Sequence, residues 1–174
     1  LARHLRKKRH LGIHSPSFTD AVMDLVKSGA VSNRKKGHFL GKSLTSYAIG
    51  TPELLYWLHR NPLIEFQSID VVANPKLIGR NDRTVVVLPV RKVDLSGGVA
   101  LHSGKGNVGD GPSEAQEFFK GASFSKKGRT IIALPSRNLR NHSNILISLE
   151  DYPNQFSIRE SLDLVVTEYG VASM

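Results

Sequence analysis

The sequence predicts an α/β fold that contains a mixed β-sheet. Helical and strand patterns alternate in the first half of the chain, whereas strand patterns follow one another in the second half. Alternation favours parallel strands joined by helices, and successive strands favour antiparallel pairs, so one sheet should hold both. We expect residues 84–90, 130–134 and 162–167 to be neighbouring strands in a single domain. Near-continuous apolar runs, as at residues 85–88, are typical of strands that are covered on both faces.

Two helices are predicted in the first half, and each begins with a capping residue followed by proline. The first covers residues 15–29, with Ser15 as its N-cap, Pro16 at its first position and Gly29 at its end. The second covers residues 51–60 and repeats the order of cap and proline. In both, apolar residues recur at helical spacing, which predicts one buried face per helix.

Further strand patterns lie at residues 68–73, 99–102 and 144–149. Asn74 and Pro75 follow the first of these patterns and are expected to end that strand.

Composition restricts the class of protein. The 174 residues are 40% hydrophobic and 22% charged, which is typical of a globular chain. The absence of cysteine excludes disulfides, zinc–thiolate sites and thiol nucleophiles, and it is compatible with a cytoplasmic protein. No apolar run reaches the roughly eighteen residues that a membrane-spanning helix needs. The chain begins without methionine and ends abruptly, and we interpret it as a piece of a longer enzyme.

The net charge of +9 favours an anionic partner. Nucleic acid, an acidic membrane and a polyphosphate-bearing cofactor all fit this charge. Residues 1–10 are strongly basic and form either a solvated helical face or an anion-binding patch. No aromatic residues are interleaved among them, which argues against a site for single-stranded nucleic acid.

A glycine-rich loop at residues 104–111 is the main candidate binding motif. It follows a predicted strand and precedes a predicted helix that begins at Pro112, an order that points backbone N–H groups at an anion. The alternative is a plain turn between strand and helix. The residues that we expect to bind the ligand are Lys105, Gly106, Gly109 and Gly111.

Other motifs are weaker. Residues 104–109 match G-x-G-x-x-G, but no acidic residue follows about twenty positions later, so we reject a dinucleotide site. His10 and His14 have the spacing of two ligands on one helical face, but no third ligand is evident and we expect no metal. Glu168 follows an apolar strand, where its carboxylate is either a structural acceptor or part of a site.

Four stretches of the sequence resemble the C-terminal domain of the acetyl-CoA hydrolase/CoA-transferase family, of the 4-hydroxybutyrate CoA-transferase kind. Their order and spacing fit over nearly the whole chain. The stretches are Leu11-Gly12-Ile13-His14 with Asp20, Asn74-Pro75 with Ile78, residues 121–136, and residues 165–172.

The resemblance implies an open twisted mixed sheet with flanking helices. It also implies that residues 1–174 are a truncated C-terminal domain, and that a further N-terminal domain completes the active-site cleft. The implied substrates are acyl-CoA and a small carboxylate, with coenzyme A as substrate, no metal, and a homo-oligomeric protein. In the family a glutamate attacks the thioester and later carries CoA as a glutamyl thioester.

The sequence departs from the family at the position of this glutamate, where Pro16 stands. Asn74 matches an asparagine that the family is thought to use beside the acyl oxygen, and Glu114 is a candidate for a relocated nucleophile. Of the family's glycine-rich run only Gly111 remains. The chain is therefore either part of an active transferase or hydrolase, or an acyl-CoA-binding relative that has lost the transfer step. A nucleic-acid-binding module, inferred from charge alone, is the remaining alternative.

Overall fold

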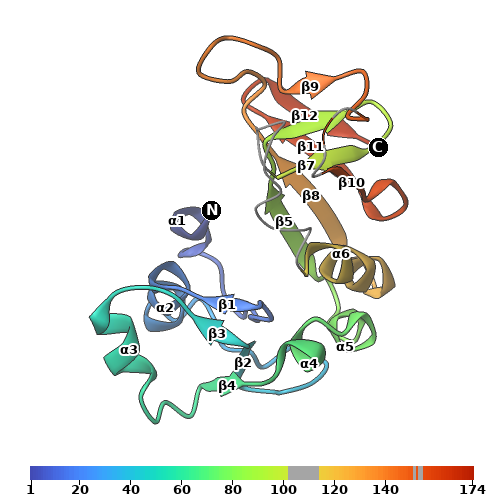
Figure 1. Ribbon diagram of the computed structural model, residues 1–174. Helices are drawn as coiled ribbons and strands as arrows, with labels where there is room; N and C mark the ends of the chain where they lie inside the picture. The colour runs from blue at the N-terminus through green and yellow to red at the C-terminus, as the bar shows by residue number, and fades with distance from the viewer. Residues whose placement is uncertain (102–113, 151, 153–154) are drawn as a thin grey trace. The chain divides into compact units, whose positions relative to one another are not determined.

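The chain divides into two compact units, residues 1–82 and 83–174, in a computed structural model (Figure 1). The structure describes residues 1–101, 114–150, 152 and 155–174. The buried apolar side chains gather in separate clusters within the units. Each unit is therefore described by itself.

The first unit consists of short elements. Its two small sheets are both parallel: β1 pairs with β3, and β2 pairs with β4. Phe18 and Trp57 stack with ring centroids 6.0 Å apart beside the buried Met23, Leu54 and Ile64. The elements are α1 (Ala2–Leu5), β1 (Ser17–Phe18), α2 (Asp20–Lys27), β2 (Ser43–Thr45), β3 (Tyr47–Ala48), α3 (Pro52–Leu58), β4 (Ile64–Phe66), α4 (Ile69–Val72) and α5 (Pro75–Gly79).

The first predicted helix begins later than the sequence indicates. Helix α2 starts at Asp20 with Thr19 as its N-cap residue, and Gly29 follows its C-terminal end at φ 73° as predicted. Ser15 and Pro16 are not its cap and first residue, because the backbone there is engaged with the chain around β2 and β3. Backbone pairing thus prevents Ser15 and Pro16 from starting the helix, although their sequence suits a helix start.

The strand predicted at residues 68–73 is wrong, since most of this segment forms helix α4. Asn74 and Pro75 do not end a strand; they begin helix α5, with Asn74 as N-cap and proline at the first position. An asparagine–proline pair is a stop signal for one element and a start signal for the next, and here the second role applies.

The second unit contains the predicted mixed sheet, in the order β12-β11-β8-β5. Strands β5, β8 and β11 are parallel neighbours, which confirms the prediction, and β12 adds an antiparallel edge. A second four-stranded sheet has the order β10-β7-β6-β9. The elements are β5 (Val85–Pro89), β6 (Lys92–Asp94), β7 (Gly98–Ala100), α6 (Ala115–Phe124), β8 (Arg129–Ala133), β9 (Ile145–Leu146), β10 (Gln155–Ser157), the short helix η1 (Arg159–Ser161), β11 (Leu164–Thr167) and β12 (Gly170–Ser173).

Helix α6 packs against β5 and β8, as Figure 1 shows, and it covers a core that includes Phe119 and Ile132. Strand β5 lies at one edge of its sheet and is only partly covered: the side chain of Val85 is 57% exposed. The apolar run of β5 therefore does not indicate burial on both faces within this unit. Strand β9 is shorter than the predicted strand at 144–149.

We predict that the central strand carries much of the stability of the second unit. Ile132 on β8 is 0% exposed, so Ile132→Ala should lower the free energy of unfolding by about 2–5 kcal/mol through lost burial and a new cavity. Val85→Ala on the exposed edge is the matched control and should cost under about 1 kcal/mol. Urea denaturation of both variants measures the difference, and equal losses would contradict this assignment of the core.

Candidate functional site

The residues predicted to form the site fall into three groups. Lys105, Gly106, Gly109 and Gly111 lie outside the described residues. Asn74 begins helix α5 in the first unit, and Glu114 is the N-cap residue of helix α6 in the second. The pairing of Asn74 with Glu114 stays a prediction.

In the first unit, His14 joins the segment at residues 11–16 to the segment at residues 72–81. Its Nε2 lies 2.7 Å from the carbonyl oxygen of Val72, and its Nδ1 lies 3.1 Å from Nδ2 of Asn81. A carbonyl only accepts and an amide N–H₂ only donates, so the imidazole carries its proton on Nε2 and accepts at Nδ1. His14 therefore joins one stretch of the family resemblance to the residues on either side of another.

Burial lowers the pKa of His14 to about 4, and the nearby charges of Lys36 and His38 act in the same direction. His14 is thus neutral near pH 7, with both ring nitrogens engaged. It is available neither as a metal ligand nor as a general base, which agrees with rejecting the His10/His14 metal site. Within the described parts of the chain, no group of three or more potential metal ligands occurs.

Lys36 lies beneath the same segment. Its Nζ donates to the carbonyl oxygens of Ile13 at 2.9 Å and Lys42 at 2.8 Å. Asn33 supports the arrangement by accepting from the Ile13 amide at 2.9 Å. Burial lowers the pKa of Lys36 to about 8.

His38 and Gly37 attach this region to helix α5. His38 Nε2 lies 3.1 Å from the carbonyl oxygen of Leu77, and the His14 and His38 rings meet edge to face at 5.2 Å. A Cβ on Gly37 would collide with the carbonyl oxygen of Arg80, so this close approach requires glycine. Burial lowers the pKa of His38, as do the charges of Lys36 and Arg80.

Asn74 is oriented by its role as a cap. Its Oδ1 accepts from the amides of Lys76 at 3.0 Å and Leu77 at 3.4 Å. With Oδ1 used in this way, Nδ2 is the part of the amide that remains for a ligand, and among the described residues it has no hydrogen-bond partner. Because His14 contacts Val72, two residues earlier, Asn74 is carried by the same framework as residues 13–16.

Pro16 lies in a bend just before β1. Its carbonyl oxygen accepts from the amides of Ser46 and Tyr47 and from Oγ1 of Thr45, at 3.0 to 3.1 Å. Residue 16 is thus held through its carbonyl oxygen, and the amide of Ser15 adds a bond to the carbonyl oxygen of Leu44. That residue 16 is the position of the family's glutamate stays a prediction.

In the second unit, Glu168 accepts from Ser136 through both carboxylate oxygens, at 2.8 Å from the amide and 2.5 Å from the hydroxyl. The two residues follow the carboxyl ends of β11 and β8, and these bonds lower the pKa of Glu168. Of the two roles that the sequence allows, the structure shows that of a structural acceptor.

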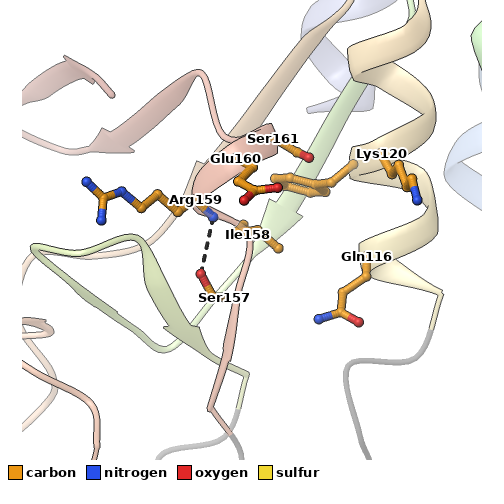
Figure 2. A pocket seen from close by; sticks show the side chains of 8 residues that line it. Gln116, Lys120, Ser157, Ile158, Arg159, Glu160 and Ser161 are labelled. Atoms are coloured by element: carbon orange, nitrogen blue, oxygen red, sulfur yellow. Dashed lines mark hydrogen bonds between the residues drawn. The ribbon is translucent and has the colours of Figure 1, made fainter.

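A cavity of about 400 Å³ lies between helix α6 and residues 157–161. Figure 2 shows Lys120 on the helix side and Glu160 on the opposite side, whereas the Arg159 side chain extends away from the helix. The cavity is lined by both positively and negatively charged side chains, so the cavity by itself does not indicate a phosphate site. The lining residues are Gln116, Phe119, Lys120, Ser157, Ile158, Arg159, Glu160 and Ser161.

Comparison with known proteins decides the family. The model of the acetyl-CoA hydrolase/transferase C-terminal domain matches residues 50–174. This chain belongs to that family. It is 38% identical to the 4-hydroxybutyrate coenzyme A transferase of Clostridium kluyveri over 98% of its own length and 40% of the relative. It is 32% identical to a succinyl-CoA:cyclohexane-1-carboxylate CoA transferase of Geobacter metallireducens over 100% of its length and 40% of the relative.

Solved structures agree. RipA from Yersinia pestis superposes with a TM-score of 0.91 at 29% identity, covering 99% of this chain and 39% of that one. A 4-hydroxybutyrate CoA-transferase from Porphyromonas gingivalis gives 0.83 at 34% identity, covering 99% and 40%. The chain thus spans about two fifths of the relatives that it matches. Within its described residues, no helix is long and apolar enough to cross a bilayer.

Sequence reasoning finds Asn74 but misses Lys36, His38 and Asn81. No local pattern marks them: Lys36 is the last residue of a basic run whose other members, Arg34 and Lys35, are exposed. The stretches that resemble the family include residues 11–14 and 74–75 but none of these three residues.

We predict that His14 makes the first unit sensitive to acid. The pKa of His14 in the folded protein, about 4, lies below the ordinary value of 6.5. The stabilisation that neutral His14 gives to the folded state is therefore present above pH 6.5 and is lost as the pH falls towards 4. Unfolding free energy should drop by about 2 kcal/mol more between pH 7 and 4.5 in the native protein than in His14→Gln. Urea titrations at both pH values measure this, and identical pH dependence in the two proteins would refute it.

Proposed function

We propose that the protein containing this chain handles acyl-CoA, by transferring CoA between an acyl-CoA and a small carboxylate or by hydrolysing the thioester. Membership of the family supports the acyl-CoA class. The observation that carries the proposal is the framework around Asn74, because His14, in one stretch of the family resemblance, bonds to Val72 and Asn81 on either side of another.

Asn74 is proposed to act on the thioester carbonyl. Its Oδ1 is committed to the start of helix α5, so the amide is oriented before any substrate arrives. An N–H donor that is held in place stabilises the negative charge that develops on the acyl oxygen during attack, and it does so without reorganising.

The nucleophile must lie elsewhere than residue 16. Pro16 provides none, and the candidates are Glu114, a residue outside this chain, or a water molecule activated by another residue. Glu114 precedes the first residue of helix α6, and its side chain does not cap that helix. A carboxylate there would attack the thioester carbon and release CoA as thiolate, which leaves a mixed anhydride. The thiolate would then attack the glutamyl carbonyl, release the first acid as its carboxylate and form a glutamyl thioester, which water or a second carboxylate resolves.

The remaining parts of the proposal concern the rest of the protein. We propose that residues 104–111 and the start of the following helix line the CoA site, and that an N-terminal domain completes the cleft. We also propose that the protein is homo-oligomeric, that it lies in the cytoplasm and that it requires no metal. Selective binding of CoA over ATP by the full-length protein would support it.

A non-catalytic acyl-CoA-binding protein is the second candidate, and Pro16 is the observation that favours it. The segment is well ordered by three hydrogen bonds to the Pro16 carbonyl. A binding role would retain this order and the Asn74 amide while dispensing with the nucleophile.

Trapping of a covalent intermediate separates these possibilities. Full-length protein is incubated with propionyl-CoA, reduced with borohydride and mapped by mass spectrometry. Modification at Glu114 is the expected result for a relocated nucleophile, and no modification with steady CoA release would indicate direct hydrolysis. Absence of both modification and turnover would leave the binding role. A salt-sensitive affinity for arbitrary DNA without CoA binding would contradict the whole proposal.

Two substitutions of Asn74 test its role. Asn74→Asp keeps an oxygen to cap helix α5 but removes the N–H donor, so turnover should fall about 10²–10³-fold while the free energy of unfolding stays within about 0.5 kcal/mol. Asn74→Ala removes cap and donor together and should also lose about 1 kcal/mol of stability. Steady-state kinetics and urea denaturation measure both quantities, and a fully active Asn74→Asp would exclude Asn74 from the reaction.

A further inference from the structure

Lys36 is a buried cation without a counterion among the described residues. The residue is only 7% exposed, and its Nζ bonds to the carbonyl oxygens of Ile13 and Lys42. Ion pairs do occur in the described part of the chain, but none of them involves Lys36. Carbonyl oxygens satisfy its N–H groups, yet they leave its unit charge unbalanced.

The groups around Lys36 do not offset this charge. His14 and His38 pack beside each other, and the pKa of each is lowered, so both are neutral above pH 7. Arg80, at the end of helix α5, adds a second positive charge near His38. The ammonium group of Lys42 is turned to Glu65 at 2.7 Å. The interior next to residues 13–16 is therefore positive.

Such an arrangement is unfavourable for folding by itself. Burial lowers the pKa of Lys36 to about 8 from 10.5, so the folded protein disfavours the charge, but the lysine is still mostly protonated at pH 7. Replacing Lys36 with an apolar side chain would remove the desolvated charge but would also leave the carbonyl oxygens of Ile13 and Lys42 without this donor, so the two effects on stability oppose each other.

We propose that Lys36 supplies the positive charge that holds a small carboxylate substrate at the site formed by residues 13–16 and Asn74. This inference rests on the proposed function and names the residue that would select its acceptor. Lys36 acts through its electric field, since a unit charge in a partly dry interior attracts an anion over several ångströms. A single enclosed charge suits a compact monoanion, whereas the CoA phosphates are bulky and carry several charges.

The test uses acetate as the probe and the full-length protein, with binding followed by line broadening of ¹³C-labelled acetate and stability by urea denaturation. Lys36→Met should weaken acetate binding about tenfold, and urea denaturation checks that the variant is folded where binding is measured. Lys35→Met is the matched control, because Lys35 is the exposed neighbour, and it should leave acetate binding unchanged. A folded Lys36→Met protein that binds acetate normally would overturn the proposal.

The pH dependence gives a second readout that does not require Lys36→Met to fold. Acetate affinity of the native protein should fall as the pH rises from 7 to 9.5, because Lys36 loses its proton near pH 8 while His14 and His38 stay neutral. Lys36→Arg keeps its charge and should show no such fall. The same fall in Lys36→Arg would assign it to another group and refute the inference.

These measurements also separate this inference from the proposed function. Acetate binding is measured at equilibrium and needs no turnover of acyl-CoA. Acetate binding that depends on Lys36 in a protein without CoA turnover would support the carboxylate site and refute the enzymatic proposal. CoA turnover together with an acetate affinity that does not depend on Lys36 would support the enzymatic proposal and refute the carboxylate site.

Discussion

The first unit depends on one neutral imidazole. His14 must carry a proton on Nε2 to donate to Val72 and must leave Nδ1 bare to accept from Asn81. A second proton would remove that acceptor and place another cation beside Lys36. Burial and the Lys36 charge both oppose this second proton, so the protonation state and the geometry support each other. Through this side chain, the loop that carries Pro16 and the helix that begins at Asn74 become one framework.

Local chemistry made part of the fold predictable. Thr51 caps helix α3 as expected, because its hydroxyl accepts from the amide of Leu54, and Gly29 takes the positive φ that a helix end favours. The β-branched strands β5, β8 and β11 were also identified, together with their adjacency. Ser15 and Pro16 look equally suited to begin a helix, but backbone bonds to residues 44–47 outweigh the local preference. Such bonds join segments that are distant in the sequence, so a short stretch of sequence does not predict them.

The candidate site, like the fold, was only partly predictable from the sequence. Asn74 was singled out because a family pattern marks it; its role in the site stays a prediction, whereas its capping of helix α5 is observed. Lys36 was not found, since its role depends on contacts with Ile13, 23 positions away, and on burial that its exposed neighbours do not share. Composition shows that the chain is basic, but it cannot distinguish a solvated lysine from a buried one. That distinction needs the folded arrangement.

Pro16 takes part in the fold through its carbonyl oxygen, and the three hydrogen bonds to that oxygen do not depend on the pyrrolidine ring. Any residue whose backbone adopts this conformation would preserve them and would add only one amide N–H. The anchoring of this segment and the identity of the side chain at residue 16 are therefore separable, so this position can vary in sequence while the architecture persists.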